Sequence, residues 1–257
     1  MKLLFYRYGS ICEPDIIAGF QELGHTIIEM TEEVSNKSLL PSECVQFITK
    51  QLFDEPVDFV FSINFFPYLS DVCQIFKLPY LCWSVDSPVM ELFSASIEHP
   101  CNRIFLFDRA QYNEILPLNP DHVFHLPLAV NIASKQQVIQ SASTELHNHF
   151  SSDISFVGSL YTEKCPYDKL TDAPAYLSGY LDGLIESQIL IYGGFLIEDL
   201  LTDDIIDQFK QHLPGFYYPP YDSHLTDRKI VAQLYISSKI SAVERVRTME
   251  YLSKKYA

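Results

Sequence analysis

The chain has 257 residues, of which 47% are hydrophobic and 20% are charged, so it carries enough apolar material to bury a full core. Its formal net charge of −15 argues against a nucleic-acid partner, because binding a polyanion requires clustered Lys and Arg. No run approaches the roughly 18 apolar residues of a membrane span, and the N-terminus has a charged apolar run without a cleavage signal. We therefore expect a folded, cytoplasmic protein without a membrane span.

The six cysteines show no paired spacing of the kind that supplies a zinc site or a redox dithiol. We interpret them as buried thiols of a protein in a reducing compartment. They are Cys12, Cys44, Cys73, Cys82, Cys101 and Cys165.

Short apolar runs alternate with amphipathic segments through the first 130 residues. Between the first two runs, Ile16, Ile17, Phe20 and Leu23 recur at helical spacing, and Gly24 stands where a left-handed C-cap belongs. This alternation predicts an α/β fold, a doubly wound parallel Rossmann-like sheet with helices on both faces. We expect the first and fourth strands to lie side by side where the strand order reverses. The predicted strands are Leu3–Arg7, Thr26–Met30, Phe59–Ile63, Tyr80–Ser84, Arg103–Phe107 and Val123–Leu126.

The turn after the first strand does not have the composition of a dinucleotide-binding loop. Residues 8–12 contain one glycine, where such a loop needs three. The chain also contains no P-loop and no Gly-x-Ser-x-Gly elbow. We therefore expect that this domain holds neither NAD nor FAD and that the protein uses no cofactor.

The second half of the chain is predicted to be mainly helical. Residues 1–131 form the first domain, 132–153 are polar and read as a linker, and 154–257 begin a second lobe. Residues 154–157 are expected to form a strand that runs into a glycine turn. Helical spacing then continues from 161 to 239 and includes an acidic helix around 197–209, and Ser241 with Glu244 is typical of a capping box that opens the last helix.

Candidate site residues follow the predicted strands, because ligands of open α/β sheets bind at the carboxyl ends of the strands. Asp86 is the candidate catalytic base, and Trp83 would stack on a sugar face. The alternative for Asp86 is a helix start, with Ser87 as N-cap and Pro88 at the first helical position. The alternative for Trp83 is an ordinary buried indole.

Other candidates carry competing structural explanations. Tyr8, Gly9, Asn64 and Ser87 are further candidate substrate-binding residues that follow strands, although turn chemistry would account for Gly9 and Asn64. His125 is a further binding candidate, but a lone histidine on a strand more often has a structural role. Asp108 and Arg109 are expected to pair with each other. His147 and His149 alternate without a third ligand at metal spacing, so no metal site is predicted.

Four motifs, in this order, resemble the N-terminal region of bacterial glycosyltransferases described as spore-maturation-protein-like. They are residues 83–88 (WSVDSP), 105–109 (FLFDR), 125–131 (HLPLAVN) and 156–159 (FVGS). The resemblance implies a GT-B glycosyltransferase that takes a nucleotide-sugar donor without a required metal. It also implies that the chain spans the acceptor-side domain and ends before most of the donor-binding lobe. Gly158 and Ser159 would then approach the donor diphosphate, unless they form an ordinary turn.

Two functional hypotheses remain at this point. In the first, the chain is the acceptor-side part of a glycosyltransferase with an unknown acceptor, it is inactive alone, and the cleft of Tyr8, Asn64, Trp83 and Asp86 binds the acceptor. In the second, it is a non-catalytic Rossmann-like module that binds a sugar, a nucleotide or a protein. The strand at 154–157 is expected to dock on the following helices or to pair across a homodimer.

Overall fold

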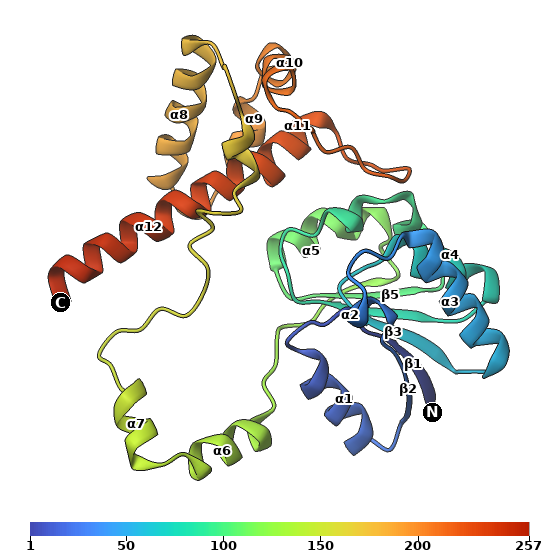
Figure 1. The fold of residues 1–257 in the computed structure, drawn as a ribbon. Helices are drawn as coiled ribbons and strands as arrows, with labels where there is room; N and C mark the ends of the chain where they lie inside the picture. The colour runs from blue at the N-terminus through green and yellow to red at the C-terminus, as the bar shows by residue number, and fades with distance from the viewer. Residues whose placement is uncertain (257) are drawn as a thin grey trace. The chain divides into compact units, whose positions relative to one another are not determined.

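The computed structural model describes residues 1–256. The chain divides into two compact units, which are described separately (Figure 1). The first contains residues 1–151 together with 221–224, and the second contains 152–220 and the residues from 225 onward. Within the described residues, no helix combines the length and the apolar character that a bilayer crossing requires.

The first unit contains a six-stranded, entirely parallel sheet, which confirms the predicted fold class. Each strand lies within one residue of its predicted bounds, because each is a short, largely apolar run bounded by turn residues. The strands are β1 (Lys2–Tyr6), β2 (Thr26–Met30), β3 (Phe59–Ile63), β4 (Tyr80–Ser84), β5 (Asn102–Leu106) and β6 (Val123–His125).

The strand order is β2-β1-β3-β4-β5-β6, which corrects the expected pairing of the first and fourth strands. β1 pairs with β2 and β3, whereas β4 lies between β3 and β5. The chain therefore reverses its direction across the sheet between β1 and β3. Connections leave these two strands toward opposite sides, which opens a crevice at their carboxyl ends.

Helices cover the two faces of the sheet unequally. Figure 1 shows α3, α4 and α5 along one face, while α1 lies on the other. Gly24 follows α1 with φ 77°, so the predicted helix and its left-handed ending are confirmed. The helices of this unit are α1 (Glu13–Glu22), α2 (Glu32–Ser35), α3 (Pro41–Asp54), α4 (Pro67–Phe76), α5 (Arg109–Ile115), α6 (Ile132–Ser141) and α7 (Thr144–Phe150), with 3-10 turns η1 (Met90–Phe93), η2 (Ala95–Glu98) and η3 (Leu116–Leu118).

On the α1 face, burial decreases from β1 toward β6. Phe5 of β1 and Phe61 of β3 are buried in a cluster that packs against α1. Trp83 of β4 and Phe105 of β5 are only half-buried, and Phe124 of β6 is 38% exposed. All-parallel sheets are normally covered on both faces, so the open side of β4 to β6 is unusual.

The predicted linker, residues 132–153, contains two short helices, α6 and α7. Each is capped by a side chain: Asn131 accepts a hydrogen bond from the Ser134 N–H, and Ser143 accepts one from the Leu146 N–H. Their apolar side chains are largely exposed, which explains why the sequence showed little apolar periodicity here.

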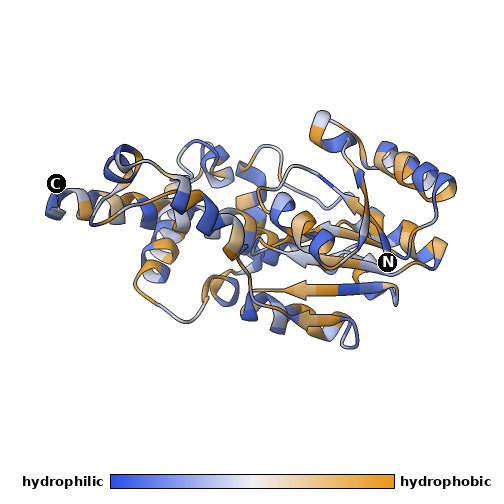
Figure 2. Ribbon diagram, turned by 90° about the horizontal axis from the view of Figure 1, so that it is seen from below, coloured by the Kyte–Doolittle hydropathy of each residue, from blue (hydrophilic) through white to orange (hydrophobic). Residues whose placement is uncertain are grey.

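The second unit is built from helices around an apolar core that includes Leu181, Phe209 and Tyr235. Helices of both units carry hydrophobic and hydrophilic segments side by side, as amphipathic packing requires (Figure 2). The elements are η4 (Pro166–Lys169), α8 (Ala175–Ile189), α9 (Ile197–Leu200), α10 (Asp203–His212), α11 (Asp227–Ile230), the π-helical segment η5 (Val231–Ile236) and α12 (Ser237–Tyr256).

Two predictions for this unit were wrong. Residues 154–157 form no strand; Ile154 and Phe156 are partly exposed and Val157 is 97% exposed. A strand needs a neighbour for its backbone groups, and an apolar run alone does not supply one. The last helix also begins before Ser241, because α11, η5 and α12 follow one another without a break from the Thr226 cap.

The expected acidic helix around 197–209 is present as two helices, α9 and α10, separated at residues 201–202. The Thr202 hydroxyl accepts a hydrogen bond from the Ile205 N–H and caps α10. A capping threonine starts a new helix in place of continuing the old one.

Residues 221–224 belong to the first unit because they pair with the segment before η2. Ser223 forms an antiparallel bridge with Ser94, the Ala95 N–H donates to the Asp222 carbonyl at 2.7 Å, and the His224 N–H donates to the Phe93 carbonyl at 2.7 Å. His224 Nε2 also lies 3.0 Å from the Glu98 carboxylate.

Candidate functional site

Asn64 is the centre of a polar cluster at the carboxyl ends of β1, β3 and β4. It follows β3 with φ 57°, a left-handed conformation that is uncommon outside glycine. Its Nδ2 donates to the Tyr8 hydroxyl at 3.0 Å and to Asp86 Oδ2 at 2.6 Å. Its Oδ1 accepts from the Val85 N–H at 3.0 Å. Both ends of one amide therefore join the loops that follow β1 and β4.

Tyr8 contributes a hydroxyl that remains protonated. Burial raises its pKa, and the Asp86 charge adds to the rise, which outweighs the opposing hydrogen bond with Ser10. Its ring packs edge-to-face against Phe66, with centroids 5.5 Å apart. The hydroxyl accepts the Asn64 bond, so its proton is available to donate to a ligand oxygen.

Asp86 is exposed, and hydrogen bonds to its backbone carbonyl hold its loop in place. Its carbonyl accepts from the Ser84 hydroxyl at 2.9 Å and from Gln111 Nε2 at 3.4 Å. Gln111 in turn accepts the Val89 N–H at 2.8 Å. One carboxylate oxygen of Asp86 is oriented by Asn64, and the residue is open to solvent.

The alternative interpretation of Asp86 as part of a helix start was wrong. Residues 86–88 form a bend, and the next element, η1, begins at Met90 after Val89. Ser87 is not an N-cap; its hydroxyl donates to Asp108 Oδ2 at 2.8 Å. Ser87 thus ties the Asp86 loop to the start of α5.

Asp108 is the N-cap of α5 and does not form the expected ion pair with Arg109. Its Oδ1 accepts from the Ala110 N–H at 2.7 Å and from the Gln111 N–H at 3.3 Å. Partial burial alone would raise its pKa, but the hydrogen bonds from Ser87 and from these two N–H groups outweigh burial and lower it. Arg109 instead lies 3.4 Å from His125 Nδ1.

The turn after β1 is filled by a carboxylate from its own chain. Glu13, which is 1% exposed, accepts on Oε1 from the N–H groups of Tyr8, Gly9 and Ser10 at 2.9, 2.7 and 2.9 Å. Its Oε2 accepts from Arg7 Nε at 2.9 Å. Successive N–H groups of this kind form an anion-binding nest, where related folds hold a phosphate. A phosphate at this turn would have to displace Glu13.

Gly9 has φ 91°, and the Lys37 ammonium lies over this turn, bonded to the Tyr8 carbonyl. A Cβ at position 9 would come within 3.1 Å of the Lys37 Nζ. Glycine is therefore favoured at this position by its backbone conformation, and any side chain there would also shift the Lys37 ammonium.

Trp83 and His125 lie outside the polar cluster. The Trp83 indole N–H donates to the Leu126 carbonyl at 3.3 Å, and its ring lines an apolar groove on the α1 face. His125 Nε2 lies 3.1 Å from the Phe107 carbonyl, and its ring lies 5.7 Å from that of Tyr112. Both residues are held by local contacts.

Gly158 and Ser159 belong to the second unit, where an arginine of α12 holds them. The Arg245 guanidinium donates to the Ser159 carbonyl at 2.6 Å and stacks 4.3 Å from the centroid of the Tyr161 ring. A Cβ on Gly158 would meet the Phe156 ring at 3.3 Å. These contacts describe a packed turn, and a role toward a donor stays a prediction.

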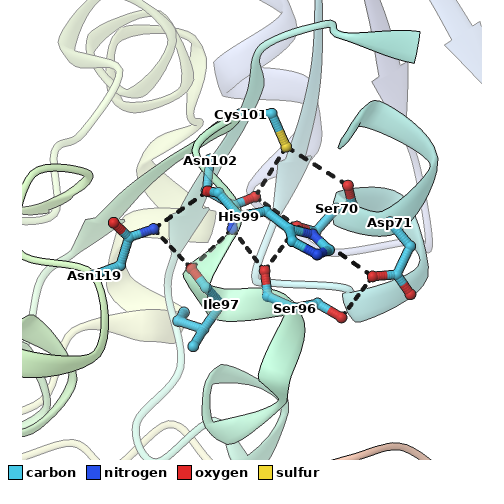
Figure 3. Close-up of polar contacts among 8 residues, drawn as sticks. All are labelled: Ser70, Asp71, Ser96, Ile97, His99, Cys101, Asn102 and Asn119. Carbon is cyan, nitrogen blue, oxygen red and sulfur yellow. Dashed lines mark hydrogen bonds and ion pairs between the residues drawn. The ribbon is translucent and has the colours of Figure 1, made fainter. Parts of the chain in front are cut away.

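A second polar cluster, which the sequence did not indicate, lies at the start of β5 (Figure 3). The buried Ser70 hydroxyl is 2.7 Å from Asn102 Oδ1 and 3.1 Å from His99 Nδ1. Asp71 Oδ1 approaches the same nitrogen at 3.7 Å. A catalytic triad needs the serine and the carboxylate on different ring nitrogens, so the arrangement is not a triad.

The polar atoms of this second cluster satisfy backbone groups. Asn102 Nδ2 donates to the Ser96 and Ile97 carbonyls at 2.9 and 3.0 Å, and Asn119 Nδ2 donates to the Ile97 carbonyl at 2.8 Å. These bonds fix η2 and the turn before β5. Buried polar groups must be paired in this way to avoid a desolvation cost.

The sequence missed Glu13, Ser84, Lys37 and Gln111. A glutamate in the first turn of the helix after β1 was the available signal for Glu13, because a carboxylate there can reach the preceding N–H groups. Over the described part of the chain, no group of three or more His, Cys, Asp or Glu side chains is arranged to hold a metal ion.

A scan against models of known protein families finds none that matches this chain. A search of curated proteins also finds no match. The architecture is that of a Rossmann-like parallel α/β domain followed by helices, and the comparisons assign it to no family.

Proposed function

We propose that the chain is the acceptor-side part of a nucleotide-sugar-dependent glycosyltransferase of the metal-independent GT-B type. The observation that carries the proposal is the cluster in which Asn64 hydrogen-bonds both Tyr8 and Asp86 at the carboxyl edge of the sheet. Asn64 also adopts a left-handed backbone conformation, and strained backbone of this kind occurs at active sites as well as in ordinary turns. The resemblance of the four sequence motifs supports the same assignment.

The chemistry of the cluster suits a hydroxyl-bearing ligand. Tyr8 offers a hydroxyl donor, Asn64 fixes the geometry, and Asp86 offers an exposed carboxylate that accepts a proton from an acceptor hydroxyl. The nest after β1 is occupied by Glu13, so a nucleotide phosphate is expected to bind elsewhere. The donor is therefore assigned to the other lobe of the complete enzyme.

The test measures binding of simple sugars to the chain itself. Saturation-transfer NMR with a panel of methyl glycosides should detect at least one ligand, and Asp86→Asn and Asn64→Ala should each weaken that signal. Asp54→Asn is the matched control, because Asp54 is an exposed carboxylate at the end of α3. Equal binding by wild type and Asp86→Asn would refute the site.

In an enzyme that contains both lobes, Asp86→Asn should lower turnover by about a hundredfold, the lower scale for removal of a general base. Circular dichroism should show an unchanged fold, because Asp86 is exposed. Sugar binding to Asp86 without any nucleotide-dependent transfer by the two-lobed protein would favour the non-catalytic module.

A further inference from the structure

An apolar groove runs along α1 on the open face of the sheet. Its floor contains Phe61, Leu81, Trp83 and Phe105, and its volume is about 590 Å³. Sites for small molecules typically have 300 to 1,000 Å³. The walls are α1 and the segment that follows β6, including Leu126 and residues 129–133.

Apart from Glu22 at the rim, the polar side chains that line the groove have partners, and most of its lining is apolar. The Trp83 indole N–H is bonded to the Leu126 carbonyl, and the Asn131 side chain caps α6. Asp15 forms an ion pair with Lys135 at 3.1 Å. A ligand that fills the groove would cover half-buried and exposed apolar side chains without leaving these polar groups unpaired.

Two contacts across the groove favour a thin ligand over a helix. The ion pair between Asp15 of α1 and Lys135 of α6 joins the two walls, and the bond from Trp83 to Leu126 brings the second wall over β4. A helix with side chains is roughly 10 to 12 Å wide. A helix in the groove would have to break these two contacts.

We propose that this groove binds the hydrocarbon chain of an amphiphile whose head group is not anionic. The inference concerns the groove alone and does not depend on the sugar-binding role of Asp86. An anionic head is excluded because Glu22, an exposed carboxylate, lies at the rim and would repel it.

Trp83 makes the test direct, because it is the only tryptophan of the chain and lies in the groove. Titration with 1-decanol should give a saturable change in Trp83 fluorescence. Decanoate, which has the same chain length and a carboxylate head, should bind about tenfold more weakly at pH 8. Glu22→Gln should narrow that difference. Equal affinity for the two probes in the wild type would overturn the exclusion of an anionic head.

Gly19 offers a way to fill the groove without disturbing the fold. It lines the groove within α1, and a Cβ built on it meets no atom within 4 Å. Gly19→Leu should remove the saturable response to 1-decanol. Gly179→Leu is the matched control, since Gly179 is also helical, lies in α8 and has open space around its Cβ position.

Two results would overturn the proposal. One is wild-type 1-decanol binding that Gly19→Leu leaves unchanged, since the probe would then bind elsewhere. The other is a wild-type dimer in light scattering that Gly19→Leu converts to a monomer, without any response to 1-decanol. That result would assign the groove to a second copy of the chain.

Discussion

At the scale of single residues, the first unit places a carboxylate where related folds place a ligand anion. Glu13 accepts hydrogen bonds from three N–H groups that would otherwise lack partners, and it also pairs with Arg7. Because the group comes from the chain itself, the turn after β1 is a structural element and the polar cluster around Asn64 is left as the ligand-facing feature.

Replacing Glu13 by Ala should therefore destabilise the first unit by about 3 to 5 kcal/mol, as expected when one partner of a buried charged network is removed. Sulfate should restore part of this loss by entering the vacated nest. Urea unfolding in sulfate and in chloride of equal ionic strength measures both effects. If sulfate stabilises wild type and Glu13→Ala equally, the nest does not bind an anion.

Asp108 predicts a pH dependence of stability. Its pKa is lower in the folded chain than in the unfolded one, so its contribution is complete above the ordinary aspartate pKa of about 4 and is lost as the pH falls through the lowered value. Asp108→Asn keeps a capping side chain but removes the titration. Unfolding free energies of the two proteins, measured from pH 6 to pH 2.5, should converge toward the acid end; parallel curves would contradict the assignment.

At the scale of elements, the sequence was sufficient where the determinants are local. The runs that became β1 to β6 and the spacing of Ile16, Phe20 and Gly24 that became α1 and its ending are each contained within a few residues. Tyr8, Asn64 and Asp86 were predicted as site residues because they follow strands, and the structure joins them by hydrogen bonds.

The errors concern partners that lie far away in the sequence. The order of the strands depends on the direction in which each connection crosses the sheet. The residues of β1 and β4 do not indicate that direction. Residues 154–157 have the composition of a strand but no neighbouring strand. The second cluster around Ser70 joins α4 to residues 96–102, and single polar residues in separate segments give no signal of such a meeting.

Gly19 and Gly24, in and directly after α1, allow the effect of backbone conformation to be measured apart from the effect of steric crowding. Neither Gly19 nor Gly24 has an atom within 4 Å of its Cβ position, but only Gly24 has a positive φ. Gly19→Ala should stabilise the protein by about 0.5 to 1 kcal/mol, because glycine weakens a helix interior. Gly24→Ala should destabilise it by about 1 to 2 kcal/mol, because alanine is strained in the left-handed region. Thermal unfolding of both variants measures the contrast, and shifts of the same sign would contradict it.

At the scale of the whole molecule, the described residues of the second unit form helices and no strand. They therefore do not supply the Rossmann-like donor lobe that the proposed enzyme class uses. The two units have separate cores, and we propose that the sheet unit carries recognition.

We accordingly expect that the chain alone does not transfer sugar. Incubation with a panel of nucleotide sugars and the methyl glycosides used for binding should release no nucleotide above the level in buffer. Added free UDP serves as the control for detection. Steady nucleotide release by this chain would show that its helical unit holds a donor, contrary to the proposal.

The pairing of residues 221–224 with the segment around Ser94 has a consequence for synthesis on the ribosome. Chains emerge from the N-terminus, and domains generally fold as they become available. All six strands have been synthesised once His125 has emerged. Residues 221–224, which hydrogen-bond Phe93 and Ala95, are synthesised only after most of the helical unit. During that interval the nascent sheet unit must fold while the segment around Ser94 lacks these hydrogen bonds. The bonds can form only when residues 221–224 have left the exit tunnel.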